Sequence, residues 1–144
     1  MKEKAENLGN NELRADSLEG IGNCQVDAAD LNEAERNLKN AIALYALCNL
    51  PDKKSKACNT LAVLYYMKGD YELALPWFER SLELATDKES IRYVRALGNS
   101  GLIYHSRGEM NRASEHYLKA IEISKKQNYT IANIIFRENL GDVL

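Results

Sequence analysis

The chain has 144 residues, 45% of them apolar, and its 19 Lys and Arg against 21 Asp and Glu give a net charge of -2. This length and apolar content are sufficient for a continuous core, which excludes a wholly disordered chain. The basic residues are scattered, so we expect no direct nucleic-acid partner. The longest apolar runs have fewer than half of the roughly 20 residues that span a bilayer, and the N-terminus has no apolar signal region. We therefore expect a cytoplasmic protein that does not enter a membrane.

The reactive side chains do not form a recognisable catalytic or metal-binding pattern. Cys24, Cys48 and Cys58 have no CxxC spacing, so reduced thiols are predicted, with one structural disulfide as the alternative. His105 and His116 lack the spacing of a metal motif, and we expect no metal and no other cofactor. A nucleophile, a base and an orienting group do not occur at any known spacing. The sequence therefore predicts a protein that is not an enzyme.

The chain contains an internal repeat. Small residues recur in two independent series, one spaced by 40, 39 and 40 and the other by 40 and 39: Gly22, Ala62, Gly101 and Gly141, and Ala34, Ala74 and Ala113. Apolar residues between these markers recur every three or four positions, which is the period of an amphipathic helix. Each unit is therefore predicted to be a pair of helices that approach each other closely at the small residues.

In chain order, the pattern predicts five segments. Residues 1–12 are the end of a preceding repeat helix, 13–50, 51–89 and 90–128 are three repeats, and 129–144 are the first helix of a fourth repeat that acts as a cap. The last assignment depends on Arg137 and Gly141, which match Leu97 and Gly101 of the third copy. We expect the chain to be a segment of a longer array of repeats.

Short turns are predicted between the paired helices. Gly69 and Gly108 are expected in the left-handed conformation that ends a helix, with Ala29 at the same place in the first copy. Asp70 is predicted to cap the next helix with its carboxylate, and Asp30 is predicted to do so in a capping box with Glu33. Between repeats, Pro51 and Asn128 are expected to end the preceding helices.

The order of these residues resembles the tetratricopeptide repeat, in a form with about 40 residues rather than the usual roughly 34. The third copy carries the resemblance most clearly, through Leu97, Gly101, Tyr104, Gly108, Ala113, Tyr117 and Ala120. The second copy matches with Cys58, Ala62, Tyr65, Gly69, Tyr71, Ala74, Phe78 and Ser81. The resemblance implies an all-α fold, an α-α superhelix or TPR solenoid of antiparallel helix pairs, whose concave groove is lined by the first helix of each pair.

The resemblance also implies a function. We expect a non-catalytic scaffold that holds a protein or peptide partner in the concave groove, and the alternative is a ligand-sensing segment of a larger bacterial-type signalling or transcriptional regulator. Self-association through the exposed end helices is a further possibility. Matching positions predict these groove residues: Asn23, Val26, Asp27, Asn59, Val63, Tyr66, Met67, Arg95, Asn99, Leu102, His105, Glu138, Asn139 and Asp142.

One known binding mode of the family is not expected. Members that clamp the C-terminal carboxylate of chaperones carry lysine, asparagine and arginine at set groove positions. Those positions here hold Glu19, Asn23, Thr60, Arg95 and Asn99. Because Glu19 would repel a carboxylate, the sequence argues against the chaperone clamp.

Overall fold

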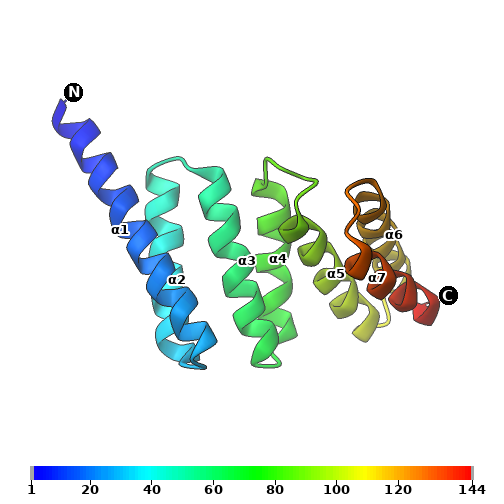
Figure 1. The fold of residues 1–144 in the computed structure, drawn as a ribbon. Coiled ribbons are helices and arrows are strands. Elements are labelled where there is room, and N and C mark those ends of the chain that lie inside the picture. Colours follow the sequence, from blue (N-terminus) through cyan, green and yellow to red (C-terminus); the bar gives the residue numbers. More distant parts are fainter. Residues whose placement is uncertain (1, 144) are drawn as a thin grey trace. The chain divides into compact units, whose positions relative to one another are not determined.

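The computed structural model describes residues 2–143, and within them it contains seven helices and no strand. The helices are α1 (Lys2–Asp27), α2 (Leu31–Leu47), α3 (Pro51–Met67), α4 (Tyr71–Leu84), α5 (Ile91–Ser106), α6 (Met110–Lys126) and α7 (Thr130–Val143). This confirms the all-α fold of antiparallel helix pairs (Figure 1). The chain divides after Thr86 into two compact units, one of helices α1 to α4 and one of helices α5 to α7.

In the first unit, α1 packs on α2, α2 on α3, and α3 on α4. Gly22 in α1 has the close-packing role that the repeat predicts, because a Cβ atom there would come within 2.9 Å of Leu38 Cγ in α2. A buried pair of serines joins α3 to α4. Ser55 Oγ donates to the carbonyl of Ser81 at 2.7 Å, and Ser81 Oγ donates to the carbonyl of Ser55 at 2.8 Å. Both hydroxyl groups are thus satisfied inside an apolar interface, where an unpaired one would be costly.

In the second unit, α5 packs on α6, and α7 contacts both of these helices. Gly101 in α5 lets Tyr117 of α6 approach, because a Cβ atom would come within 2.7 Å of Tyr117 Cε1. Val94 and Ile103 of α5 are also buried in this unit. At the start of α5, Ser90 Oγ accepts a hydrogen bond from the Tyr93 backbone N–H at 3.1 Å, which is a side-chain N-cap.

The left-handed turns confirm the predicted helix ends. Gly69 and Gly108 both have a φ of 77°, and Ala29 has a φ of 62° in the same place. Asn128 also adopts the left-handed conformation, with a φ of 60°. At each site, backbone N–H groups return to carbonyls of the last helical turn, as in the Asp30 N–H bond to Gln25 O at 2.8 Å. Asparagine tolerates this conformation better than alanine, so Ala29 is the strained member of the set.

Three predictions about helix ends are wrong. Asp70 and Asp30 precede α4 and α2, but neither side chain makes a capping hydrogen bond, because both residues have ψ near 70° instead of the extended value usual at an N-cap. Glu33 pairs instead with Arg36 one turn along α2. Pro51 does not end α2 but begins α3, where its missing N–H needs no partner, and the left-handed residue before it is Asn49.

The first helix also differs from the prediction. The repeat pattern predicts that a preceding helix ends by residue 12, but α1 is continuous from Lys2 to Asp27. No proline interrupts this stretch, and Gly9 is accommodated within the helix, so nothing local stops it. The N-terminal turns of α1 extend past the end of α2 in Figure 1, and the described side chains from Glu3 to Asn10 are exposed there.

Candidate functional site

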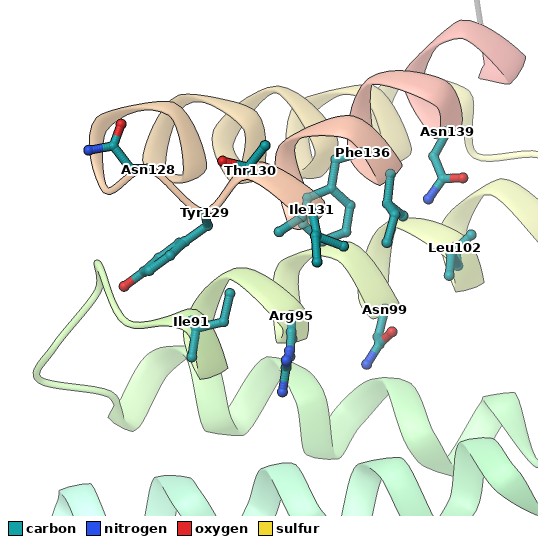
Figure 2. A pocket seen from close by; sticks show the side chains of 12 residues that line it. Ile91, Arg95, Asn99, Leu102, Asn128, Tyr129, Thr130, Ile131, Phe136 and Asn139 are labelled. Carbon is teal, nitrogen blue, oxygen red and sulfur yellow. The ribbon is translucent and has the colours of Figure 1, made fainter.

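A hollow of about 610 Å³ lies between α5 and α7. It is lined by Ile91, Arg95, Asn99 and Leu102 of α5, by Asn128 and Tyr129 of the α6–α7 turn, and by Thr130, Ile131, Ala132, Ile135, Phe136 and Asn139 of α7. In Figure 2, Tyr129 lies above Ile91 at one end, and Asn139 lies above Leu102 at the other. We call this site the α5–α7 hollow.

The distance between the two helices of the hollow is set by Phe136 and Gly98. Phe136 is 7% exposed, and its ring occupies the space that a Cβ atom on Gly98 would need. Glycine at this position allows the α7 aromatic ring to rest directly on the α5 backbone. The ring thereby forms the floor of the hollow, and Ile131 and Ile135 on the same helix remain exposed beside it.

The α6–α7 turn is held to the start of α5 by one acidic residue. Tyr129 Oη donates to the Glu89 backbone carbonyl at 3.0 Å, and Gln127 Nε2 donates to Glu89 Oε2 at 3.0 Å. Lys126 forms an ion pair with the same carboxylate. These contacts tie the turn that leads into α7 to the residues that lead into α5, so the site is built from packed elements.

The α5–α7 hollow carries one charged side chain, and the charge is not neutralised within the hollow. Arg95 is the only charged residue among the 12 that line it. Arg95 is exposed, and it has no ion-pair partner among the described residues. Asn99 and Asn139 occupy matching positions one repeat apart, and both are half-buried. With Asn128, Tyr129 and Thr130, the hollow thus combines apolar walls with one cation, three amides and two hydroxyl groups, which suits a ligand with apolar, anionic and hydrogen-bonding parts.

A second hollow, of about 320 Å³, lies between α1 and α3 in the first unit and differs in character. We call it the α1–α3 hollow; Asp16, Glu19, Gly20, Asn23, Lys53 and Lys56 line it. Lys53 Nζ lies 2.9 Å from carboxylate oxygens of both Glu12 and Asp16. The hydrogen bond from Lys53 holds the pKa of the Asp16 carboxyl below its usual value, and a second one from Tyr45 adds to this.

The remaining acid of this hollow is also engaged by the protein. Tyr45 Oη lies 2.6 Å from Glu19 Oε2 and 2.8 Å from Asp16 Oδ1. Glu19 is only 8% exposed, and burial, aided by the Glu19 carboxylate, raises the pKa of Tyr45. The charges of the α1–α3 hollow therefore largely serve the packing of α1 against α2 and α3, in contrast to the unpaired Arg95.

Some of the predicted groove residues line one of the two hollows. Four of the predicted residues line the α5–α7 hollow, namely Arg95, Asn99, Leu102 and Asn139, and Asn23 lines the α1–α3 hollow. Val26 is 9% exposed, so its side chain belongs to the core and is not open to a partner. The other predicted residues line neither hollow: Asp27, Asn59, Val63, Tyr66, Met67, His105, Glu138 and Asp142. Tyr66 instead packs against Tyr71, with ring centroids 5.1 Å apart.

Several residues of the α5–α7 hollow were not predicted. Ile91, Ile131 and Ile135 contribute much of its apolar lining. The repeat could have predicted two of them, since Ile131 and Ile135 lie one repeat after Ile91 and Arg95. Asn128 and Tyr129 lie in a turn, where a helical pattern gives no information about side-chain direction.

Residues 2–143 contain no cluster of three or more His, Cys, Asp or Glu side chains that could hold a metal ion. Cys24, Cys48 and Cys58 are free thiols, exposed, half-buried and buried respectively. None of the helices, over the part of the chain that is described, combines the length and apolar content needed to cross a bilayer.

The chain consists of consecutive helix pairs that share one sequence period and are joined by left-handed turns, and a hollow lies between the first helices of neighbouring pairs. These features define a helical-repeat protein of the solenoid class. The tetratricopeptide repeat family model matches residues 55–126, which is half of the chain. The chain belongs to the tetratricopeptide repeat family.

Curated relatives cover the repeats only in part. Photosystem I assembly protein Ycf3 of Prochlorococcus marinus subsp. pastoris is 34% identical over 101 residues, which are 65% of this chain and 54% of the relative. Response regulator aspartate phosphatase E of Bacillus subtilis is 25% identical over 100 residues, which are 69% of this chain and 26% of that protein. The chain thus spans about half the length of the first of these relatives, and about a quarter of the second.

Solved structures share the fold at low sequence identity. BtubC from P. vanneervenii superposes with a TM-score of 0.81 at 20% identity, over 92% of this chain and 56% of that one. PcrH in complex with the chaperone binding region of PopD gives 0.71 at 18% identity, over 89% of both chains. The translocator chaperone SycD of Yersinia enterocolitica gives 0.71 at 17% identity, over 89% of this chain and 81% of that one. At these identities, the likeness establishes the solenoid fold alone.

Proposed function

We propose that this protein is a non-catalytic scaffold that binds a protein or peptide segment, and that the α5–α7 hollow is its main contact site. The observation that carries the proposal is the composition of the hollow. Its walls are largely apolar, and its amides and single arginine have no counter-group among its other lining residues. Peptide segments bind such surfaces because apolar side chains leave water while backbone groups find hydrogen-bonding partners.

The residues of the hollow also support a role without chemistry. Its 12 lining residues include no Asp, Glu, His, Cys, Ser or Lys. A general base is normally drawn from these types. The two lining residues with hydroxyl groups, Tyr129 and Thr130, have no such base among the other lining residues, and the Tyr129 hydroxyl donates to the Glu89 carbonyl. Binding is therefore the role that its chemistry supports.

The comparisons support an assembly or chaperone-like role for such binding. PcrH has been crystallised with a segment of PopD, SycD is described as a translocator chaperone, and Ycf3 is described as a photosystem I assembly protein. By analogy, we propose that this chain holds a segment of a protein partner, in the cytoplasm, without a metal, nucleic acid or membrane. Self-association through the outer faces of α1 and α7 belongs to the same proposal.

A second candidate is a ligand-sensing segment of a larger regulator. The similarity to response regulator aspartate phosphatase E favours it, because that relative covers a larger share of this chain than Ycf3 does. In this version a peptide that bound between α5 and α7 would alter their packing, and an effector region elsewhere would respond. The repeat boundaries at 13–50, 51–89 and 90–128, with a capping helix from 129, remain proposals in both cases.

A peptide-display experiment tests the proposed function. Short random peptides are selected on the wild-type protein, and the affinity of the enriched peptides is measured for Ile135→Asp and for Leu118→Asp. Ile135 lines the hollow and is 46% exposed, whereas Leu118 on α6 is similarly exposed, at 54%, but lies outside it. We expect at least a tenfold loss for Ile135→Asp, since a charge then faces the bound apolar residue, and little change for Leu118→Asp. Equal binding to both variants would exclude the α5–α7 hollow as the site.

A further inference from the structure

We infer that the segment bound by the α5–α7 hollow carries a carboxylate next to a large apolar side chain, with the carboxylate on Arg95 and the apolar group against Ile135 and Phe136. This rests on the proposed function and specifies the chemistry of the partner.

The α1–α3 hollow of the first unit holds acids that pair with its own cation Lys53, whereas the α5–α7 hollow holds no acid beside Arg95. Arg95 matches Lys56 in α3, one repeat earlier. The position one further repeat earlier, in α1, is Asp16, which lines the α1–α3 hollow together with Lys56. Asp16 forms an ion pair with Lys53 of α3 at 2.9 Å across that hollow, and the charge of Lys56 further lowers the pKa of the Asp16 carboxyl. In the first unit, an acid on α1 is therefore neutralised by a lysine on α3.

At the same repeat positions, the two helices of the α5–α7 hollow carry a cation on α5 and an apolar residue on α7. Ile135 of α7 occupies the repeat position of Arg95, one repeat later. Both line the hollow, and none of the other lining residues is acidic. An arginine beside an apolar wall is less well hydrated than one on an open surface, and its planar guanidinium can donate two parallel hydrogen bonds to a carboxylate. The missing acid is thus the group that a partner would supply.

The apolar side chain expected in the partner is inferred from the exposed apolar residues at the floor of the hollow. Phe136 is nearly buried on Gly98, while Ile131 is 76% exposed, so a complementary side chain would cover Ile131 and rest above the ring. Asn99 and Asn139 lie near opposite walls, at matching repeat positions, and each can both donate to and accept from a peptide group. A short extended or helical segment with adjacent apolar and acidic residues satisfies all of these features.

The test repeats the display selection on three proteins, namely wild type, Arg95→Glu and Arg137→Glu. Arg137 is the matched control, because it is an exposed arginine of α7 that does not line the hollow. For wild type and Arg137→Glu, we expect enriched peptides to carry Asp or Glu close in sequence to Leu, Ile, Phe or Met. For Arg95→Glu, we expect Lys or Arg in place of the acid. Replacing the acid of a selected peptide by its amide is expected to weaken binding to wild type roughly tenfold.

The outcomes separate the two claims. Apolar peptides that lose affinity for Ile135→Asp but show no acidic preference would overturn this inference and leave the proposed function standing. An acidic preference that persists in Arg95→Glu would also overturn it, because the cation would then lie elsewhere. Failure to enrich any peptide that responds to Ile135→Asp would overturn both. Circular dichroism of each variant confirms that the helices are intact.

Discussion

Phe136 of α7 packs on the α5 backbone at Gly98, and its ring occupies the space that the side chain of any larger residue at position 98 would need. This contact fixes the separation of α5 and α7, and it therefore determines the depth of the α5–α7 hollow between them. A glycine required by packing thus shapes the proposed binding surface.

The first prediction concerns this contact. Gly98→Ala should lower the free energy of unfolding by about 1–3 kcal/mol, because the new methyl group overlaps the Phe136 ring inside a packed interface. Chemical denaturation of the purified chain would measure it. Gly20→Ala is the control, since a Cβ atom there has no neighbour within 4 Å. That variant should be neutral or stabilising by up to about 1 kcal/mol, because alanine favours the helix. Equal loss in both variants would show that Phe136 is not seated at Gly98.

A second prediction tests the close approach of α3 and α4. Ala74 is completely buried at the repeat position of Ala34 and Ala113. Ala74→Leu would force extra methyl groups between the helices and should reduce stability by about 1–3 kcal/mol, which lowers the melting temperature by several degrees. Leu73→Ala, at the exposed neighbouring position, should change the melting temperature little. An unchanged melting curve for Ala74→Leu would contradict the packing.

The third prediction is a pH dependence of stability through Glu35. Hydrogen bonds from Tyr65, at 2.6 Å, and Lys39, at 2.9 Å, lower the pKa of the Glu35 carboxyl from about 4.5 to about 2, and the charge of Lys68 adds to this. Because the folded-state pKa lies below the unfolded one, the contribution is fully present above pH 4.5 and is lost as pH falls toward 2. Over this window the wild type should lose more stability than Glu35→Gln when both are unfolded with denaturant at a series of pH values. Parallel losses would show that Glu35 titrates normally.

The fourth prediction concerns thiol reactivity. Cys24 is exposed, whereas Cys58 is completely buried, and burial raises the pKa of the Cys58 thiol to about 11. At neutral pH, a thiol-specific reagent should modify Cys24 rapidly and Cys58 only after the first unit opens. Mass spectrometry of peptides at successive times would identify each site, and Cys58→Ala would confirm the slow phase. Rapid labelling of Cys58 in the native chain would contradict its burial.

The sequence predicted the local features best, because each depends on a few neighbouring residues. The left-handed conformations at Gly69, Gly108 and Asn128 follow from their position after a helical stretch. The caps expected from Asp30 and Asp70 failed because composition indicates which residue can cap, while the local backbone angles decide whether it does. The continuity of α1 was missed for a related reason, since repeat alignment gives a boundary where the chain itself has no helix-stopping residue.

The lining of the α5–α7 hollow was predicted only in part, and the reason lies in tertiary packing. Repeat alignment places Arg95, Asn99 and Leu102 on the face of α5 that lines the α5–α7 hollow, because that face recurs once in each repeat. It could not show that Phe136 fills the space above Gly98, or that Glu89 draws Tyr129 and Gln127 toward α5. These contacts join residues that lie about one repeat apart in sequence, and they determine where the hollow opens.

The most direct test of the central claim is a map of backbone and side-chain amide chemical shifts on addition of a peptide selected by display. We expect the largest changes to cluster at the α5–α7 hollow, including the side-chain amides of Asn99 and Asn139 and the backbone of Ile135. Changes centred on α1 to α4, or on the α6 face that carries Leu118, with the hollow unaffected, would contradict the assignment of this hollow as the binding site.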